Sequence, residues 1–443
     1  MPGDAAPREA RTGHARRIVL INDTSDAPNW GAKATSEALR DLLGAAGGEV
    51  VSTLYSSSLL GPSWRSRALT RRAVTRTKLI LRSGLRRFAE KVGNRVSVTL
   101  PDPLARRAER LEPLAQRVMR GETFADELAA LRQGDAVVIN GEGCIYGRRR
   151  ESFMMFFLAY LAKVHLGKTT VLVNHSAELG DPSLREVAAH VLPLLDDVIF
   201  REPHSARRAP IQRGHGGADA LYAFPPCPSW DAARLLPLDA RFASFDPEAP
   251  YVCVGGSSAL FRSDEGWRAA RADPHAEFLT LCQTLKATFA QVVLTASSAP
   301  DMRLFEPLAA RLGLPLLPTG TPTRLAQDVL GGASAYVGGR WHGGVFALSG
   351  GAPVVALSAY TPKMEALLEQ AELPGPVFDV FSVGRDAKGI VALTERHVAA
   401  GDALRERLRA RAQTLRQHAW DNVRFLQPTP LVNPTLDEAE VIL

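Results

Sequence analysis

The stretch that decides the fold runs from Arg16 to Leu54 and reads RRIVLINDTSDAPNWGAKATSEALRDLLGAAGGEVVSTL. It begins with an apolar run at 16–21, continues through a helical pattern at 32–43 that ends in glycines, and returns to an apolar run at 50–54. An apolar run with β-branched residues beside turn-forming residues predicts a buried strand. Strand–helix–strand units of this length are typical of a parallel α/β sheet.

The same alternation continues along the rest of the chain. Further strands are predicted at 135–139, 169–174, 197–200, 251–254, 291–295, 335–337 and 353–357. Each ends in polar or glycine-rich residues, and open α/β sheets bind their ligands at these ends.

A proline-rich stretch without periodicity, at 224–250, predicts a linker between two domains. We therefore expect two Rossmann-like α/β domains that face a cleft, the first spanning 15–230 and the second 248–400. The remaining residues, 401–443, should form helices that pack back across the joint and a tail.

The composition sets broad limits. A chain of 443 residues with 46% hydrophobic and 23% charged residues suits a soluble protein of two domains. The longest apolar run, 153–161, falls short of the ~20 residues that span a bilayer and predicts a buried helix. Residues 1–17 lack a secretory pattern. We expect a cytoplasmic protein whose cysteines, Cys144, Cys227, Cys253 and Cys282, are free thiols.

A basic segment at 65–95 interrupts the alternation. It holds eleven Lys or Arg against one acid, Glu90, a charge of +10 that leaves −4 for the rest of a chain of net charge +6. Such concentrated charge predicts a contact with an anionic membrane surface or a pyrophosphate-linked lipid. The alternative is a helical excursion whose arginines pair with acids elsewhere on the protein. One face of a helix here would carry Leu81, Leu85, Phe88 and Val92.

The most informative motif is Val337-Gly338-Gly339-Arg340-Trp341-His342-Gly343-Gly344-Val345. It predicts a strand end followed by the start of a helix, whose free N–H groups and positive dipole end favour an anion. Arg340 can bind a carboxylate or phosphate with two nitrogens, and His342 can donate or accept a proton near neutral pH. The alternative is a structural turn whose arginine pairs with a nearby carboxylate.

Weaker candidates stand at the ends of other predicted strands. Arg201 would point into the cleft, or pair with Glu202 at the surface. Ser257 and Ser258 follow two glycines, so their turn could direct N–H groups at a phosphate, or be an ordinary connection.

Two candidates for contacts with a sugar remain. His175 could touch a sugar hydroxyl or be structural, and Glu142 could act as a base or sugar contact or stabilise its loop. The chain lacks the phosphate-binding, dinucleotide and zinc-protease motifs, and its His and Cys lack metal-ligand spacing.

Four motifs in order give the chain a family resemblance. Arg340-x-His342-Gly343, with Gly350-Gly351-Ala352-Pro353 and Lys363 after it, resembles the C-terminal signature of the polysaccharide pyruvyl transferases. The stretch 197–205 is similar to that family's strand ending in Arg-Asp/Glu with a later Ser. Asn29-Trp30-Gly31 resembles its Asn-x-Gly, and Asn140-Gly141-Glu142-Gly143 stands where the family has a glycine triplet.

The resemblance implies a GT-B-like enzyme that moves pyruvate from phosphoenolpyruvate onto a sugar diol as a cyclic ketal. Arg340 and His342 would be catalytic. The donor would be bound by Arg201, Arg340, Gly343, Ser257, Ser258 and Lys363, and the acceptor by Asn29, Glu142 and His175.

We expect no metal and no organic cofactor. The partner would be a sugar of a polysaccharide or lipid-linked oligosaccharide, not a nucleic acid, with the inner membrane face as a possible docking surface for 65–95. Two alternatives are a glycosyltransferase with a nucleotide-sugar donor and a non-catalytic, membrane-associated scaffold of polysaccharide assembly.

Overall fold

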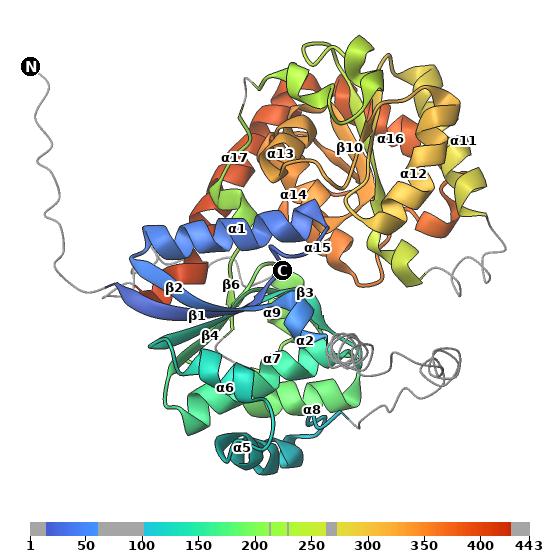
Figure 1. The fold of residues 1–443 in the computed structure, drawn as a ribbon. Coiled ribbons are helices and arrows are strands. Elements are labelled where there is room, and N and C mark those ends of the chain that lie inside the picture. Colours follow the sequence, from blue (N-terminus) through green and yellow to red (C-terminus); the bar gives the residue numbers. More distant parts are fainter. Residues whose placement is uncertain (1–14, 61–101, 212–213, 228–229, 263–272, 427–443) are drawn as a thin grey trace, which may run out of the picture.

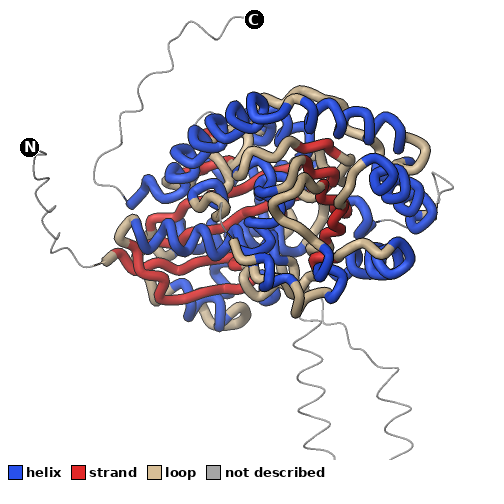
Figure 2. The backbone as a smooth tube through the Cα atoms, turned by 90° about the horizontal axis from the view of Figure 1, so that it is seen from above, coloured by secondary structure: helices blue, strands red, loops and turns tan. Residues whose placement is uncertain are grey.

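The computed structural model describes residues 15–60, 102–211, 214–227, 230–262 and 273–426. The basic segment 65–95 lies outside these residues. Within them the chain forms two parallel sheets, with helices on the outer side of each sheet and a shared helical layer between them (Figures 1 and 2). This is the predicted arrangement of two Rossmann-like domains.

The N-terminal sheet has six parallel strands. Its order is β2 (Gly48–Tyr55), β1 (Arg16–Asp23), β3 (Ala136–Tyr146), β4 (Thr169–Glu178), β5 (Asp197–Phe200) and β6 (His215–Gly216). Side chains alternate between its faces: Ile18 and Leu20 enter the central core, whereas Val19 and Ile21 enter the outer one. Burial on both faces explains why these strands are continuous apolar runs in the sequence.

The C-terminal sheet has five parallel strands. Its order is β11 (Val354–Ala356), β10 (Ala335–Gly339), β7 (Val252–Ser257), β8 (Val292–Thr295) and β9 (Leu316–Leu317). The chain order reverses beside β7, as it does beside β1 in the other sheet. Ligands of open α/β sheets bind at such reversals.

The helices divide into three layers. The outer layer of the N-terminal sheet contains α2 (Ser56–Leu59), α5 (Leu111–Met119), α6 (Ala125–Leu131), α7 (Arg150–Tyr160) and α8 (Pro182–Val191). The outer layer of the C-terminal sheet contains α11 (Pro274–Thr288), α12 (Ala299–Leu312) and α16 (Ala387–Ala399). The central layer contains α1 (Trp30–Ala45), α13 (Thr323–Gly332), α14 (Trp341–Ser349), α15 (Lys363–Gln370) and α17 (Gly401–Ala419).

Helix α1 joins the two domains, because it packs on β2 and β3 of the N-terminal sheet and on α13 and α14 of the C-terminal domain. The Trp30 ring stacks on Phe346 of α14, with centroids 5.4 Å apart, and its Nε1–H donates to the carbonyl of Ala296 at 3.2 Å. The side chains of both sheets that face inward therefore belong to one continuous core.

The C-terminal helices return to the N-terminal sheet, as predicted. After α17 a short 3-10 helix, η9 (Trp420–Leu426), reaches β4 and β5. Arg424 donates two hydrogen bonds to the Asp197 carboxylate, at 2.7 and 2.8 Å, and Asn422 donates to the carbonyl of Ala218. These contacts fasten the end of the described chain across the joint.

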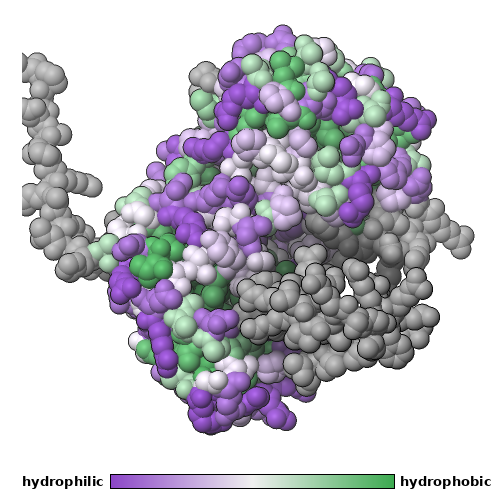
Figure 3. Space-filling model, in the orientation of Figure 1, coloured by the Kyte–Doolittle hydropathy of each residue, from purple (hydrophilic) through white to green (hydrophobic). Residues whose placement is uncertain are grey.

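The predicted strands are all present, and the predicted buried helix is α7, whose residues are almost all buried. None of the helices in the described residues is both long and apolar enough to cross a membrane. On the face drawn in Figure 3, hydrophilic side chains lie among the apolar ones.

Candidate active site

A cleft of about 400 Å³ lies where the carboxyl ends of strands from both sheets meet. The carboxyl-terminal part of β3 lines it, together with residues after β5, β7, β8, β10 and β11 and the start of α1. The structure brings most of the predicted site residues to this cleft: Asn29, Glu142, Arg201, Ser258, Arg340, His342, Gly343 and Lys363. The convergence follows from topology, since all strands of each sheet point the same way.

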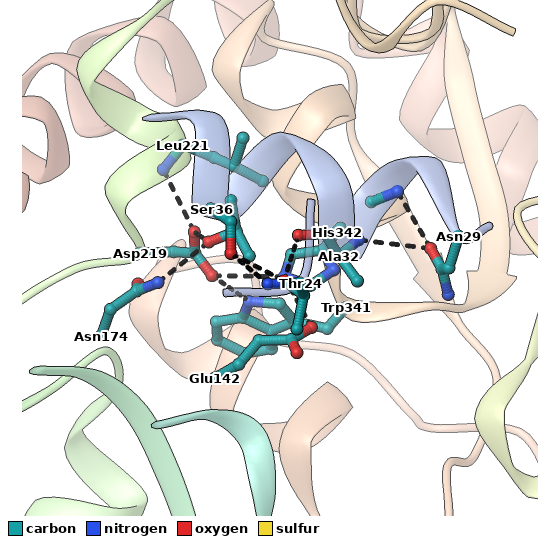
Figure 4. A network of polar contacts seen from close by, with 12 residues as sticks. Thr24, Asn29, Ala32, Ser36, Glu142, Asn174, Asp219, Leu221, Trp341 and His342 are labelled. Carbon is teal, nitrogen blue, oxygen red and sulfur yellow. Dashed lines mark hydrogen bonds and ion pairs between the residues drawn. The ribbon is translucent and has the colours of Figure 1, made fainter. Parts of the chain in front are cut away.

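His342 stands in the first turn of α14, with its Nε2 among charged groups from the N-terminal domain (Figure 4). Nε2 lies 3.6 Å from Asp219 Oδ2, 3.8 Å from Glu142 Oε1 and 3.4 Å from Arg201 Nη1. An imidazole that lies beside two carboxylates at the edge of a cleft can exchange a proton with a bound substrate.

Arg201 is a fully buried cation beside His342, with 1% of its surface exposed. Its Nε donates to Ser176 Oγ at 2.9 Å, its Nη1 donates to Asp219 Oδ2 at 3.2 Å, and its guanidinium carbon lies 4.6 Å from the Trp341 ring centroid. In place of the predicted alternative, a surface pair with Glu202, Arg201 is buried and pairs with Asp219, and the Glu202 side chain caps α9 (Pro203–Arg208). Arg201 therefore places a desolvated positive charge at the cleft.

Arg340 forms a buried ion pair on the other side of the cleft. Its Nη2 donates to Asp301 Oδ1 at 2.6 Å and to Ser298 Oγ at 2.8 Å. The Asp301 carboxylate is itself fully buried and accepts from Ser297. Arg340 therefore lines the cleft and also pairs with a carboxylate, which fixes its guanidinium.

Lys363 opens α15 and lies near both arginines. Its Nζ is 5.0 Å from the Tyr360 ring centroid, and the Tyr360 ring packs on Tyr146 with centroids 4.7 Å apart. Burial, followed by the charges of Arg201 and Arg340, lowers the pKa of Lys363 to about 7. The ammonium form therefore begins to lose its proton near neutral pH.

Three further cleft residues have distinct roles in the local structure. Asn29 caps α1, since its Oδ1 accepts from the N–H groups of Gly31 and Ala32 at 2.9 and 3.3 Å. Glu142 has a positive φ of 46° that directs it toward the cleft. The Ser258 hydroxyl is buried and has no hydrogen-bond partner within the described residues. It can therefore form a hydrogen bond with a ligand in the cleft.

The structure does not bring His175 and Ser257 to the cleft, since neither is among the described residues that line it. His175 Nδ1 lies 2.8 Å from the carbonyl oxygen of Ile199, and burial lowers its pKa to about 3. Ser257 Oγ donates to the Ser358 carbonyl at 2.5 Å and accepts from the Ala259 N–H. Both side chains connect neighbouring segments.

Sequence reasoning missed the two buried carboxylates, Asp219 and Asp301. Asp219 follows a glycine pair in an aperiodic stretch, and Asp301 stands in the first turn of α12, where an acid is common. Neither position has a sequence pattern that would distinguish a functional carboxylate from a structural one.

No group of three or more His, Cys, Asp or Glu that could hold a metal ion occurs in the part of the chain that the structure describes. The ionisable side chains that line the cleft in these residues include arginines, a lysine, a histidine and a carboxylate.

A family model described as polysaccharide pyruvyl transferase matches residues 29–359, which include the cleft residues from Asn29 to Gly343. The chain belongs to the polysaccharide pyruvyl transferase family. Membership in this family makes it a transferase of polysaccharide biosynthesis, as the motifs predicted. Among curated proteins no sequence matches this member of the family.

Solved structures share the fold at low identity. MnaA of S. aureus, solved with UDP, superposes with a TM-score of 0.50 at 10% identity over 93% of this chain and 95% of that one. A putative UDP-N-acetylglucosamine 2-epimerase from Listeria monocytogenes gives 0.50 at 13% identity over 93% and 94%. These likenesses establish the GT-B-like architecture of this family member and nothing about its ligands.

Proposed function

We propose that this enzyme transfers a pyruvyl group from phosphoenolpyruvate to two hydroxyls of a sugar in a surface polysaccharide precursor, and so forms a cyclic ketal. The observation that carries the proposal is that His342 shares a cleft lined by both domains with three basic side chains, Arg201, Arg340 and Lys363. Phosphoenolpyruvate is a small anion with a phosphate and a carboxylate, and fixed cations in a site largely closed to water favour it.

The proposed chemistry needs one proton donor. His342 Nε2–H protonates the methylene carbon of the donor, and positive charge develops on the carbon that bears the phosphate. A sugar hydroxyl adds to that carbon and gives its proton to Glu142, which lies 3.8 Å from His342. The C–O bond to phosphate then breaks, and the second hydroxyl closes the ring. Of the two hydroxyl protons released, one balances the proton gained by carbon and the other leaves on the phosphate.

Arg340 and Lys363 bind the donor from the C-terminal domain, and Arg201 binds it from the N-terminal domain. The unsatisfied hydroxyl of Ser258 adds a hydrogen bond to a donor oxygen. No metal ion or organic cofactor takes part in this scheme. A lipid-linked acceptor, presented at the inner membrane face, belongs to the same proposal and rests on the charge of 65–95.

A nucleotide-sugar donor is the competing hypothesis, because S. aureus MnaA, of the same architecture, was solved with UDP. Thermal unfolding with each ligand separates the two. Phosphoenolpyruvate at a hundred times its Kd should stabilise the protein by about 2.7 kcal/mol. UDP and UDP-sugars should leave the melting temperature unchanged. Stabilisation by UDP alone would overturn the proposal and favour a glycosyltransferase.

A further inference from the structure

The carboxylate of Asp219 lies beside His342 but has no exposed surface and does not itself line the cleft. It precedes the short 3-10 helix η4 (Ala220–Ala223), which packs against α1 and α17. Burying an ionised carboxylate costs free energy unless hydrogen-bond donors and cations surround it. The partners of its two oxygens therefore indicate what it does.

The first oxygen, Oδ1, is held by the protein framework. It accepts from Thr35 Oγ1 at 2.8 Å and from the Leu221 N–H at 3.1 Å. Asn174 donates to the same Thr35 hydroxyl at 3.0 Å and accepts from the Ala220 N–H at 3.0 Å. These bonds connect α1, β4 and η4, so the carboxylate cannot rotate away from the cleft (Figure 4).

The second oxygen, Oδ2, faces the groups that carry the proposed chemistry. Trp341 Nε1–H donates to it at 2.9 Å and Arg201 Nη1 donates to it at 3.2 Å. His342 Nε2 lies slightly farther away, at 3.6 Å. Asp219 Oδ2 therefore places negative charge beside the imidazole without a short hydrogen bond to Nε2.

The charges around His342 explain why this carboxylate matters. Arg201 Nη1, 3.4 Å from Nε2, opposes a proton on the ring, whereas Asp219 and Glu142 favour one. From α1 the neighbour is Gly31, which carries no charge. Glu142 is partly open to the cleft, whereas Asp219 is fully enclosed and less screened by solvent.

We propose that Asp219 is a positioning residue that offsets the Arg201 charge, so that His342 carries the proton it delivers to the donor. The delivery of that proton to the donor rests on the proposed function. The coupling between Asp219 and His342 can be measured without turnover. The same carboxylate fixes the relative positions of Arg201 and Trp341, from different domains, around the imidazole.

The test follows the His342 ring directly, by NMR titration of the full-length protein labelled with 13Cε1-histidine. The His342→Gln variant assigns the signal among the ten histidines. Asp219→Asn should lower the titration midpoint of His342 by at least about one pH unit. Glu142→Gln should lower it less. Ser36→Ala, which removes nearby hydrogen bonds to Thr24 and Asn140 but none to Asp219, should leave it within about 0.2 units.

A second variant should raise the titration midpoint of His342. It tests the proposal even if Asp219→Asn does not fold. Trp341→Phe removes one donor from Oδ2 and leaves its charge less compensated, so the midpoint should rise. An unchanged midpoint in the folded variants, or a larger effect from Glu142→Gln than from Asp219→Asn, would overturn the proposal.

Turnover links this coupling to the reaction. Asp219→Asn should move the basic limb of the pH–rate profile to lower pH by the same amount, with kcat reduced at least ~10-fold at neutral pH, and Asp219→Glu should restore part of the loss. A wild-type protein without pyruvyl transfer would refute the proposed function but not the coupling. If Asp219→Asn shifts the His342 midpoint but keeps a normal pH–rate profile, the coupling exists but plays no part in catalysis.

Discussion

Gly31 of α1 lies so close to His342 of α14 that no larger residue fits between them. A Cβ built at position 31 would be 2.7 Å from His342 Cβ and 3.0 Å from its Nδ1. This contact sets the position of the imidazole from the side opposite its charged neighbours. It also gives the glycine of the Asn29-Trp30-Gly31 motif a physical reason, namely close approach across the domain joint.

Gly31→Ala should displace His342 and lower turnover at least ~10-fold, with a stability loss of about 1–3 kcal/mol from overpacking. Gly44→Ala is the matched control, because it lies in the same helix, is exposed, and its Cβ would meet no atom within 4 Å. That control should keep wild-type turnover and gain about 0.5–1 kcal/mol. Steady-state kinetics and urea unfolding measure both; full activity in Gly31→Ala would contradict the proposed constraint.

His342→Ala should lower turnover at least ~100-fold, because it removes the only proton donor that the proposed mechanism uses. Donor affinity should change less than about threefold, since Arg201, Arg340 and Lys363 remain. Single-turnover ketal formation and calorimetry with phosphoenolpyruvate separate the two quantities. Near-normal turnover would reassign His342 to a structural role.

Arg340→Lys should weaken phosphoenolpyruvate binding at least ~10-fold. Asp301 and Ser298 occupy one nitrogen of the guanidinium, and a lysine amine cannot meet them and the donor in the same geometry. Arg405→Lys is the control, because Arg405 donates to backbone carbonyls of 331 and 333, outside the residues that line the cleft. Equal donor affinities in all three proteins would argue against a contact from Arg340.

Donor affinity should fall as the pH rises from 7 to 9. Burial and the two arginines lower the pKa of Lys363 to about 7, so its ammonium is lost over this interval. The donor phosphate should stay dianionic there, because a phosphate monoester has its second pKa near ~6. Calorimetry at several pH values should show the decline in the wild type and a flat profile in Lys363→Met. A parallel decline in both would exclude Lys363 as its cause.

The full-length protein should sediment with anionic vesicles at low salt and be released at high salt. Each Lys or Arg near such a surface contributes about 1 kcal/mol, and 65–95 holds eleven of them. Replacing Arg82, Arg86 and Lys91 with Glu should abolish sedimentation without changing phosphoenolpyruvate binding. Equal partitioning onto anionic and neutral vesicles, or onto neither, would remove the membrane from the proposed function.

The strands could be predicted because buried parallel strands leave continuous apolar runs in the sequence. The two-residue edge strands β6 and β9 leave no such run, and the prediction missed them. The cleft could be placed because parallel strands bring their carboxyl ends together, and Arg201 and Arg340 each follow such an end.

The contacts within the site could not be predicted in the same way. His175 was expected after the end of its strand, but β4 continues to Glu178, so the residue lies within the sheet and packs on Phe200. Asp219 acquires its role only from Thr35, Arg201 and Trp341, which tertiary packing brings together from three separate parts of the chain.

The stacking of Trp30 on Phe346 has a consequence for synthesis of the chain. Helix α1 leaves the ribosome early, but Phe346, which covers the Trp30 ring, is made about 300 positions later. At translation rates of about 5–20 residues per second, that interval lasts roughly 15–60 seconds. During this interval the N-terminal sheet can form, but the Trp30 ring remains exposed to solvent. The nascent protein is thus most vulnerable to aggregation through the surface that later joins its two halves, and chaperone demand should peak before Phe346 emerges.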